Sequence, residues 1–195
     1  MDISSVTVFC ASSSLAGGVF VEETRILARC LVKENLLVQY GGGADGLMGH
    51  LADTVLELNG KIRGVIPRFM IDEGWVHPGV PDMVSVNDMQ ERKKKIMMDT
   101  DAIISLPGGY GTLEELTEAI TLKQLGLITS PIIIVNINGY FNALLDFFST
   151  MLKNQFISKE HCHVWQSVER SMDVIPALKK TESWDPVRAR NNAAI

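Results

Sequence analysis

Short apolar runs alternate with helical patterns along almost the whole chain. Runs rich in β-branched residues predict strands at 6–10, 36–40, 62–66, 83–87, 102–106 and 132–137, with a short strand within 164–168. Apolar positions three or four residues apart predict helices at 21–34, 46–59, 89–99, 112–125, 140–153 and 173–180. Strands that are apolar on both faces and alternate with helices indicate a parallel sheet covered on both sides.

This alternation predicts an α/β fold, a Rossmann-like doubly wound parallel sheet with helices on both faces. Residues 1–180 are expected to form a single nucleotide-binding domain, and residues 181–195 a weakly ordered C-terminal tail. A chain of 195 residues, 46% hydrophobic and 21% charged, is long enough to bury a core.

Charge and cysteine content narrow the classes of partner. The chain has 23 acidic and 18 basic residues, a formal net charge of −5, which disfavours general binding to nucleic-acid phosphates. The three cysteines are widely spaced, and their odd number predicts free thiols in a reducing compartment. The first residues lack the features of a signal peptide, and no apolar run approaches the roughly 20 residues of a membrane span. We expect a cytoplasmic protein without nucleic-acid or membrane partners.

Three loops follow predicted strands and precede predicted helices: ASSSLAGG (11–18), GGGADGLMG (41–49) and PGGYGT (107–112). Ligands of doubly wound folds bind beyond the carboxyl ends of the strands, and helix N-termini favour anions. Three such loops at one sheet edge indicate a small molecule that carries phosphate, although each glycine turn alone is also typical of a tight corner.

Gly41, Gly43 and Gly46 match G-x-G-x-x-G, the dinucleotide fingerprint. The match lies in the second strand–helix unit, and the next strand ends without the acidic residue that would hold a ribose diol. Arg68 at that place is instead suited to a 2′-phosphate. An NADP-linked enzyme is therefore one alternative.

Glu114 and Glu115 lie in the first turn of the helix predicted after the third loop. Two carboxylates beside a bound anion would repel it unless one has another role. Thr112 and Glu115 have the spacing of a capping box, in which each side chain bonds the other residue's backbone N–H. A structural and a catalytic interpretation of Glu115 are both open from this spacing.

The position of Arg92 favours the catalytic interpretation of Glu115 over the structural one. In the helix at 89–99 the apolar stripe passes through Met89, Ile96 and Met97, and Arg92 falls on that stripe, whereas Lys94 and Lys95 point further round. Lys93 is ambiguous. An arginine on a buried stripe needs an anionic or hydrogen-bonding partner, which either Glu115 or a ligand phosphate would supply.

The segments GGGADGLMG (41–49), MQERKKKIM (89–97) and PGGYGTLEE (107–115) together resemble the LONELY GUY (LOG) family, the cytokinin-activating phosphoribohydrolases. The family hallmark P-G-G-x-G-T-x-x-E is matched from Pro107 to Glu115, and the likeness covers roughly residues 6–180. Similar proteins are often labelled lysine decarboxylases, but no lysine here lies in a recognisable pyridoxal-phosphate setting.

The resemblance implies hydrolysis of the N-glycosidic bond of a cytokinin riboside 5′-monophosphate, an N6-modified AMP, with plain AMP as a further candidate substrate. The products are the free base and ribose 5-phosphate. The resemblance makes Arg92 and Glu115 the catalytic pair and gives the phosphate to the glycine loop with Thr112. Cleavage builds positive charge on the sugar, which a carboxylate stabilises while it positions or deprotonates water.

The candidate substrate-binding residues are Ser12, Gly42, Gly43, Met89, Lys93, Gly108, Gly109, Gly111 and Thr112. The reaction needs no metal and no cofactor. A non-catalytic nucleotide sensor or carrier of the same fold is the second function to consider. The resemblance also implies a homodimer with active sites near the subunit interface.

Overall fold

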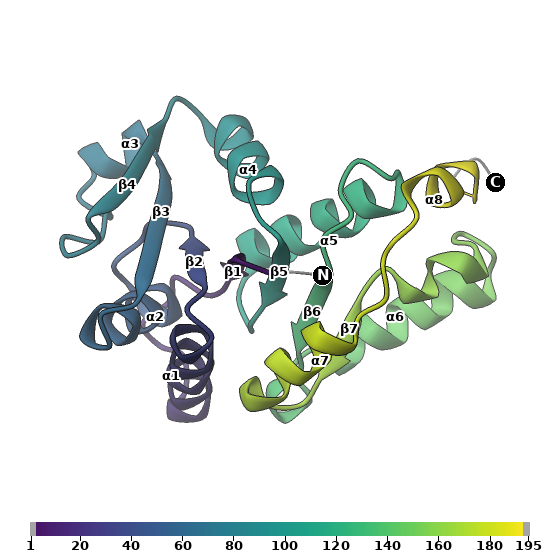
Figure 1. The fold of residues 1–195 in the computed structure, drawn as a ribbon, viewed down its shortest axis with the longest axis horizontal. Coiled ribbons are helices and arrows are strands. Elements are labelled where there is room, and N and C mark those ends of the chain that lie inside the picture. Colours follow the sequence, from purple (N-terminus) through teal and green to yellow (C-terminus); the bar gives the residue numbers. More distant parts are fainter. Residues whose placement is uncertain (1–2, 193–195) are drawn as a thin grey trace.

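The computed structural model describes residues 3–192 and contains one seven-stranded sheet in which all neighbouring strands are parallel (Figure 1). Its order is β4-β3-β2-β1-β5-β6-β7. The strands are β1 (Ser5–Phe9), β2 (Leu37–Tyr40), β3 (Lys61–Pro67), β4 (Asp82–Val86), β5 (Ala102–Ser105), β6 (Ile132–Val135) and β7 (Gln166–Val168). The chain winds outward from β1 in both directions, so the topological switch point lies between β1 and β5.

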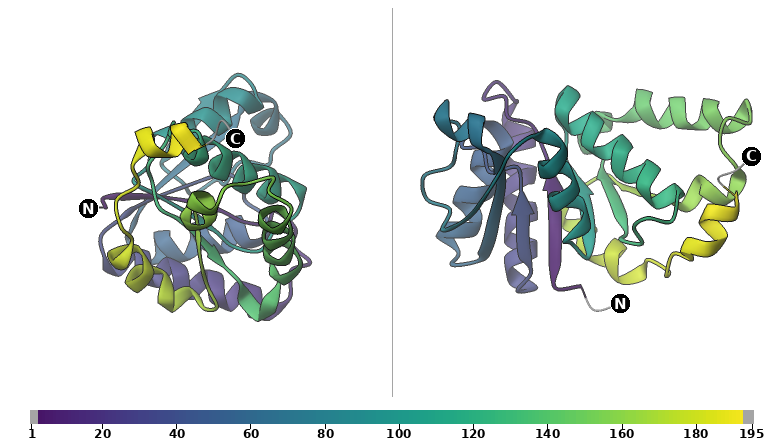
Figure 2. Two further views of the ribbon diagram at one scale, coloured as in Figure 1. Left: turned by 90° about the vertical axis from the view of Figure 1, so that its right-hand side faces the viewer. Right: turned by 90° about the horizontal axis from the view of Figure 1, so that it is seen from above.

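Helices cover both faces of this sheet, and Figure 2 shows the sheet between the two layers. One layer contains α1 (Gly18–Lys33), α2 (Gly46–Glu57) and α7 (Val174–Lys180). The other contains α4 (Met89–Met98), α5 (Tyr110–Gln124) and α6 (Asn142–Lys153). Shorter helices are α3 (Arg68–Asp72), α8 (Pro186–Asn192) and the 3₁₀ turns η1 (Ile137–Gly139), η2 (Lys159–His163) and η3 (Ser171–Asp173). The predicted doubly wound fold is confirmed.

Alternation along the central strands explains the two layers. Val8 and Ile104 point into the cluster under α1 and α2, whereas their neighbours Phe9 and Ile103 point into the cluster under α4 and α5. Strands buried on both faces read as continuous apolar runs, which is why the sequence pattern located them well.

Two polar residues of the central strands fix α4 on the sheet. The Thr7 hydroxyl donates to the backbone carbonyl of Ile96 at 2.6 Å, and the Gln39 amide donates to the same carbonyl at 3.1 Å. Both side chains are buried, so these bonds satisfy polar groups that would otherwise be costly. The position of α4, and of every side chain on its inner face, is thereby set by the sheet.

The segment 181–195 differs from the weakly ordered tail that we expected. It contains α8, whose start is capped by the Asp185 carboxylate, which accepts from the N–H groups of Val187 and Arg188. Ala189 is buried, and the Trp184 indole donates to the Lys123 carbonyl at 2.9 Å near the end of α5. Residues 193–195, which belong to the same expectation, lie outside the described residues.

Within residues 3–192 no helix has the length and apolar character needed to cross a membrane. The described residues also contain no group of three or more histidine, cysteine or acidic side chains arranged to hold a metal. In the motif HCH (161–163), the His161 ring contacts the Ser158 hydroxyl and the Ala189 carbonyl, so both of its nitrogens have protein partners.

Candidate active site

A cavity of about 460 Å³ opens at the switch point, beyond the carboxyl ends of β1, β2, β3 and β5. It receives residues from all three glycine-containing loops and from α3, α4 and α5. Of the residues predicted from sequence, eight line it: Ser12, Gly43, Met89, Arg92, Gly109, Gly111, Thr112 and Glu115. Gly42, Lys93 and Gly108 do not.

Arg92 forms the floor of this cavity. The Asp88 carboxylate caps α4 by accepting from the Glu91 N–H at 2.8 Å, which fixes where the helix begins. The Arg92 side chain is 8% exposed, and its guanidinium donates through Nε to the Val65 carbonyl at 3.1 Å and through Nη2 to the Gly41 carbonyl at 3.3 Å. The planar fork of donors is thus held by backbone groups of β3 and of the loop after β2.

The third contact of this guanidinium is with Glu115. Arg92 Nη1 donates to Glu115 Oε1 at 3.1 Å, and the Glu115 side chain is as buried as its partner. Burial raises the pKa of Glu115 above its ordinary value, while the Arg92 charge opposes that rise and the Glu114 charge adds to it. A role that needs the ionised carboxylate is therefore confined to pH values above this raised pKa.

The capping-box interpretation of Thr112 and Glu115 is wrong. Helix α5 begins at Tyr110 with Gly109 as its N-cap, and the Leu113 N–H donates to the Gly109 carbonyl at 3.0 Å. Thr112 is therefore the third residue of the helix and cannot cap it. Glycine caps without a side-chain bond, so the pattern carried no signal for the true start.

Contacts around Gly41 explain why one glycine of the G-x-G-x-x-G match is required by the protein itself. A Cβ built at Gly41 would lie 2.2 Å from Arg92 Nη2, so any larger residue would displace the guanidinium. The glycine makes room for a protein side chain rather than for a dinucleotide. Arg68, the residue considered for a 2′-phosphate, is exposed and does not line the cavity. The geometry gives the NADP interpretation no support.

The loop before α5 has two kinds of glycine. A Cβ at Gly108 would lie 2.0 Å from the Thr112 hydroxyl, so packing requires glycine there. A Cβ at Gly109 or Gly111 would meet no atom within 4 Å, and both residues face the cavity. Protein packing does not require glycine at these two positions, whereas close approach of a ligand to the backbone would. The first N–H groups of α5 point to the same place.

Lys93 lies behind the cavity rather than in it. Its buried ammonium pairs with the Glu114 carboxylate and, at 2.8 Å, with Glu118 Oε2. Hydrogen bonding to Glu114, followed by that to Glu118, raises the pKa of Lys93. The two helices are thus joined by a second ionic contact beside the Arg92–Glu115 pair, and Lys93 acts as a tie between α4 and α5.

One wall of the cavity is apolar. Met48, Met70, Met89 and Trp75 line it, and Trp75 is half exposed. The loop that carries Trp75 is hydrogen-bonded to the glycine loop after β2: the Ala44 N–H donates to the Trp75 carbonyl and the His77 N–H to the Gly42 carbonyl. Gly42, with φ of 77°, supports this loop and does not face the cavity. Met70 comes from α3, a helix that the pattern did not predict.

The family model described as "Possible lysine decarboxylase" matches residues 48–178. The cytokinin riboside 5′-monophosphate phosphoribohydrolase LOG5 of Arabidopsis thaliana is 37% identical over 182 residues, covering 93% of this chain and 78% of that protein. LOG1 of the same plant is 36% identical over 181 residues, covering 93% and 84%. The chain belongs to the LOG family.

The resemblance inferred from the three motifs is therefore confirmed. Among residues 3–192, no lysine lines the cavity of this LOG protein, so the site offers no lysine for the pyridoxal-phosphate chemistry that the family model's description suggests. Solved structures share the LOG fold more widely. The molybdenum cofactor carrier protein of Chlamydomonas reinhardtii matches with a TM-score of 0.71 at 14% identity, covering 92% of this chain and 98% of that one. The molybdenum cofactor binding protein of Rippkaea orientalis gives 0.69 at 15% identity, covering 92% and 97%.

Proposed function

We propose that this protein hydrolyses the N-glycosidic bond of cytokinin riboside 5′-monophosphates, which are N6-modified forms of AMP, to give free base and ribose 5-phosphate. The observation that carries the proposal is the buried Arg92–Glu115 pair, set beside a glycine-rich helix N-terminus at the switch point. Membership of a family whose curated members bear this activity in their names supports it.

The phosphate is assigned to the start of α5. Its first N–H groups have no acceptor within the helix, and the open space beside Gly109 and Gly111 lets an anion approach them. Thr112 is buried at the same place and adds a hydroxyl. The Tyr140 hydroxyl, which donates to the Gly108 carbonyl at 2.7 Å, holds the loop from outside. Ser12 approaches from the loop after β1.

Glu115 is assigned to the sugar. As the bond between C1′ and the base nitrogen breaks, positive charge develops on the ribose, and a carboxylate in a water-poor site stabilises it strongly. The electron pair of the broken bond leaves with the base. Water forms the new bond to C1′, and we assign Glu115 to orient that water and accept its proton, which balances the proton that the departing base takes up. Arg92 is a positioning residue for Glu115: its three acceptors leave the guanidinium little freedom, so the carboxylate it bonds is fixed as well.

The base is assigned to the apolar wall of the cavity. Met48, Met70, Met89 and Trp75 offer a polarisable surface for a purine and for an apolar N6 substituent. A prenyl-like group would remove apolar surface from water there, whereas the amino group of AMP would not. We therefore propose a preference for the modified nucleotide over AMP, with AMP as a ligand of the same cavity.

The test follows free base by chromatography during incubation with isopentenyl-AMP, with AMP, and with isopentenyladenosine, which lacks the phosphate. We expect base release from isopentenyl-AMP, slower release from AMP and very little from the nucleoside, because the nucleoside leaves the α5 terminus empty. Binding of isopentenyl-AMP without any release of base would reject the hydrolase and favour the nucleotide carrier.

We further propose a homodimer. Helix α6 buries none of its residues fully, and Tyr110, Leu113 and Phe147 are exposed on α5 and α6. A second copy seated on these helices would cover apolar surface next to the cavity. Light scattering should then give twice the chain mass of 21.5 kDa, and a mass of one chain would contradict the proposal.

The proposed location is the cytoplasm, because Cys10, Cys30 and Cys162 are all free thiols, as is usual in a reducing compartment. Burial also raises the pKa of the Cys10 thiol, which makes that thiol unreactive.

A further inference from the structure

A second, larger cavity lies away from the active site. It measures about 710 Å³ and is bounded by the end of α5, by η2 and by the segment that leads into α8. Figure 1 shows α8 folded back beside the far end of α5. None of its lining residues is shared with the cavity at the switch point.

The feature that sets this cavity apart is Lys123. Lys123 is 2% exposed, yet within the described residues its ammonium pairs with no carboxylate. The ammonium lies over the ring of Trp184, whose centroid is 5.3 Å from Nζ. Lys93, equally buried on α4, has two carboxylates. A buried cation without a neighbouring anion raises the free energy of the folded protein. An anion bound beside Lys123 would lower that free energy.

The charges around Lys123 point the same way. Lys159, Lys180 and Arg188 line the cavity with exposed side chains, and none of them forms an ion pair within residues 3–192. The carboxylates that line it are those of Glu160, Glu182 and Asp185; the last is committed to the N-cap of α8. His161 is held by two protein contacts, and His163 is exposed. Four basic side chains thus line the cavity with three carboxylates, one of which already accepts two hydrogen bonds at the start of α8.

We propose that this cavity is a second ligand site, which binds a compact polyanion of the phosphate or polycarboxylate class with Lys123 as its buried contact. The cations at the rim draw the anion in, and the ammonium at the floor supplies the charge that no protein carboxylate balances. Burial lowers the pKa of Lys123 to about 8. A bound anion would favour the charged form and raise that pKa again.

This second cavity is separate from the catalytic cavity, but both receive residues from helix α5. Lys123 follows Glu115 by eight residues on α5, roughly 12 Å along one rigid helix. The proposal does not depend on the hydrolase function, because neither Lys123 nor Trp184 lines the catalytic cavity.

The experiment uses tryptophan fluorescence of the protein with Trp75→Phe and Trp165→Phe, in which Trp184 is the remaining tryptophan and reports the second cavity. Inorganic pyrophosphate and citrate are titrated separately. We expect a saturable change with a dissociation constant below roughly 1 mM for at least one anion, and at least a tenfold weaker response when Lys123→Met is added. Tighter binding of pyrophosphate or of citrate decides between phosphate and polycarboxylate.

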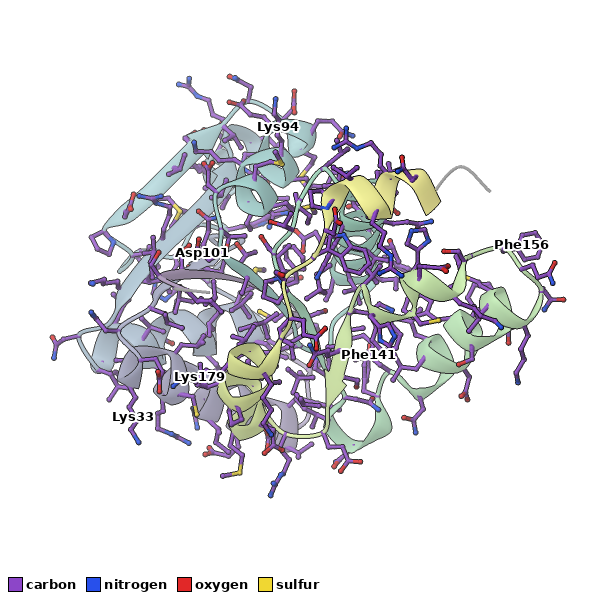
Figure 3. All side chains as sticks on the ribbon, turned by 45° about the vertical axis from the view of Figure 1, so that its right-hand side comes forward. Lys33, Lys94, Asp101, Phe141, Phe156 and Lys179 are labelled. Carbon is purple, nitrogen blue, oxygen red and sulfur yellow. The ribbon has the colours of Figure 1, made fainter. Side chains whose placement is uncertain are left out.

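Matched variants make the outcome specific. Lys94→Met removes an exposed lysine from the outer side of α4 (Figure 3) and should leave the affinity unchanged. Arg188→Gln at the rim should weaken binding by a smaller factor than Lys123→Met. The Lys123→Met protein should still release base from isopentenyl-AMP at the parental rate.

Equal anion affinity in the parent and in Lys123→Met, or no saturable change with either anion, would overturn the proposal. Should Lys123→Met not fold, the rim variant and its salt dependence carry the test: an affinity unchanged by Arg188→Gln and by added salt would overturn it equally. Loss of base release in the parent would leave these binding results intact, so failure of the hydrolase proposal is distinguishable.

Discussion

The Glu115→Gln protein should bind isopentenyl-AMP but release its base at least roughly 10³-fold more slowly than the parent. Glutamine keeps the size of the side chain and still accepts a hydrogen bond from Arg92 Nη1, so the cavity keeps its shape. It cannot offer negative charge to the developing ribose cation or take a proton from water. Single-turnover release of free base, followed by chromatography, measures the loss, and titration calorimetry measures the retained binding.

Glu114→Gln is the control for that experiment. It makes the same chemical change one residue earlier, on a carboxylate that is more than half exposed and pairs with Lys93 rather than with Arg92. We expect a loss of less than about tenfold, because Glu118 still holds Lys93. Equal losses in the two variants would show that Glu115 acts only through the general charge of α5, and the assigned role would fall.

The Arg92→Lys protein should lose roughly 10²-fold in rate and about 2 kcal/mol in stability. One ammonium cannot reach the carbonyls of Gly41 and Val65 and the Glu115 carboxylate in the geometry of the planar fork. The space beside Gly41 is shaped for the guanidinium, and lysine leaves it partly empty. Urea unfolding measures the stability, and the chromatographic assay measures the rate.

Arg29→Lys provides the comparison for the Arg92 experiment. It is the same substitution in an exposed ion pair with Glu22, where little stability is at stake. We expect its unfolding midpoint and its rate to match those of the parent. A fully active Arg92→Lys enzyme would mean that the charge alone, without the fork, is enough to position Glu115.

Sequence located the sheet and most helices because their signals are local. Strands such as 102–106 and 132–137 are apolar on both faces, and their flanking turns contain glycine or proline. Arg92 was also found from sequence, since a charged residue on an apolar helical stripe requires a partner. The catalytic role of Glu115 was implied by the resemblance to the LOG family, since its spacing alone left a structural interpretation open.

The features that the sequence left open depend on contacts between distant segments. Lys93 fits the apolar stripe about as well as the solvent face, and only its distance to Glu114 and Glu118 shows that it ties two helices. Gly42 and Gly108 are glycines in the same loops as the glycines that line the cavity, and only the backbone conformation of Gly42 and the packing around both set them apart. The order of residues 186–192 depends on Trp184 reaching the end of α5, a contact across 61 residues of chain.

The two ionic contacts between α4 and α5 fix more than two side chains. Arg92 pairs with Glu115 and its neighbour Lys93 with Glu114, so the two helices, which both run from the carboxyl ends of the strands toward the amino ends, meet in one register. Only residues 99–101 join α4 to β5. Losing or gaining one residue there would turn α4 by about 100° relative to the sheet or shift it along its axis, so both cations would move away from their carboxylates. Loop length is usually among the most freely varied properties of a fold; here the length of one three-residue connection, far from any ligand, is part of what defines the active site.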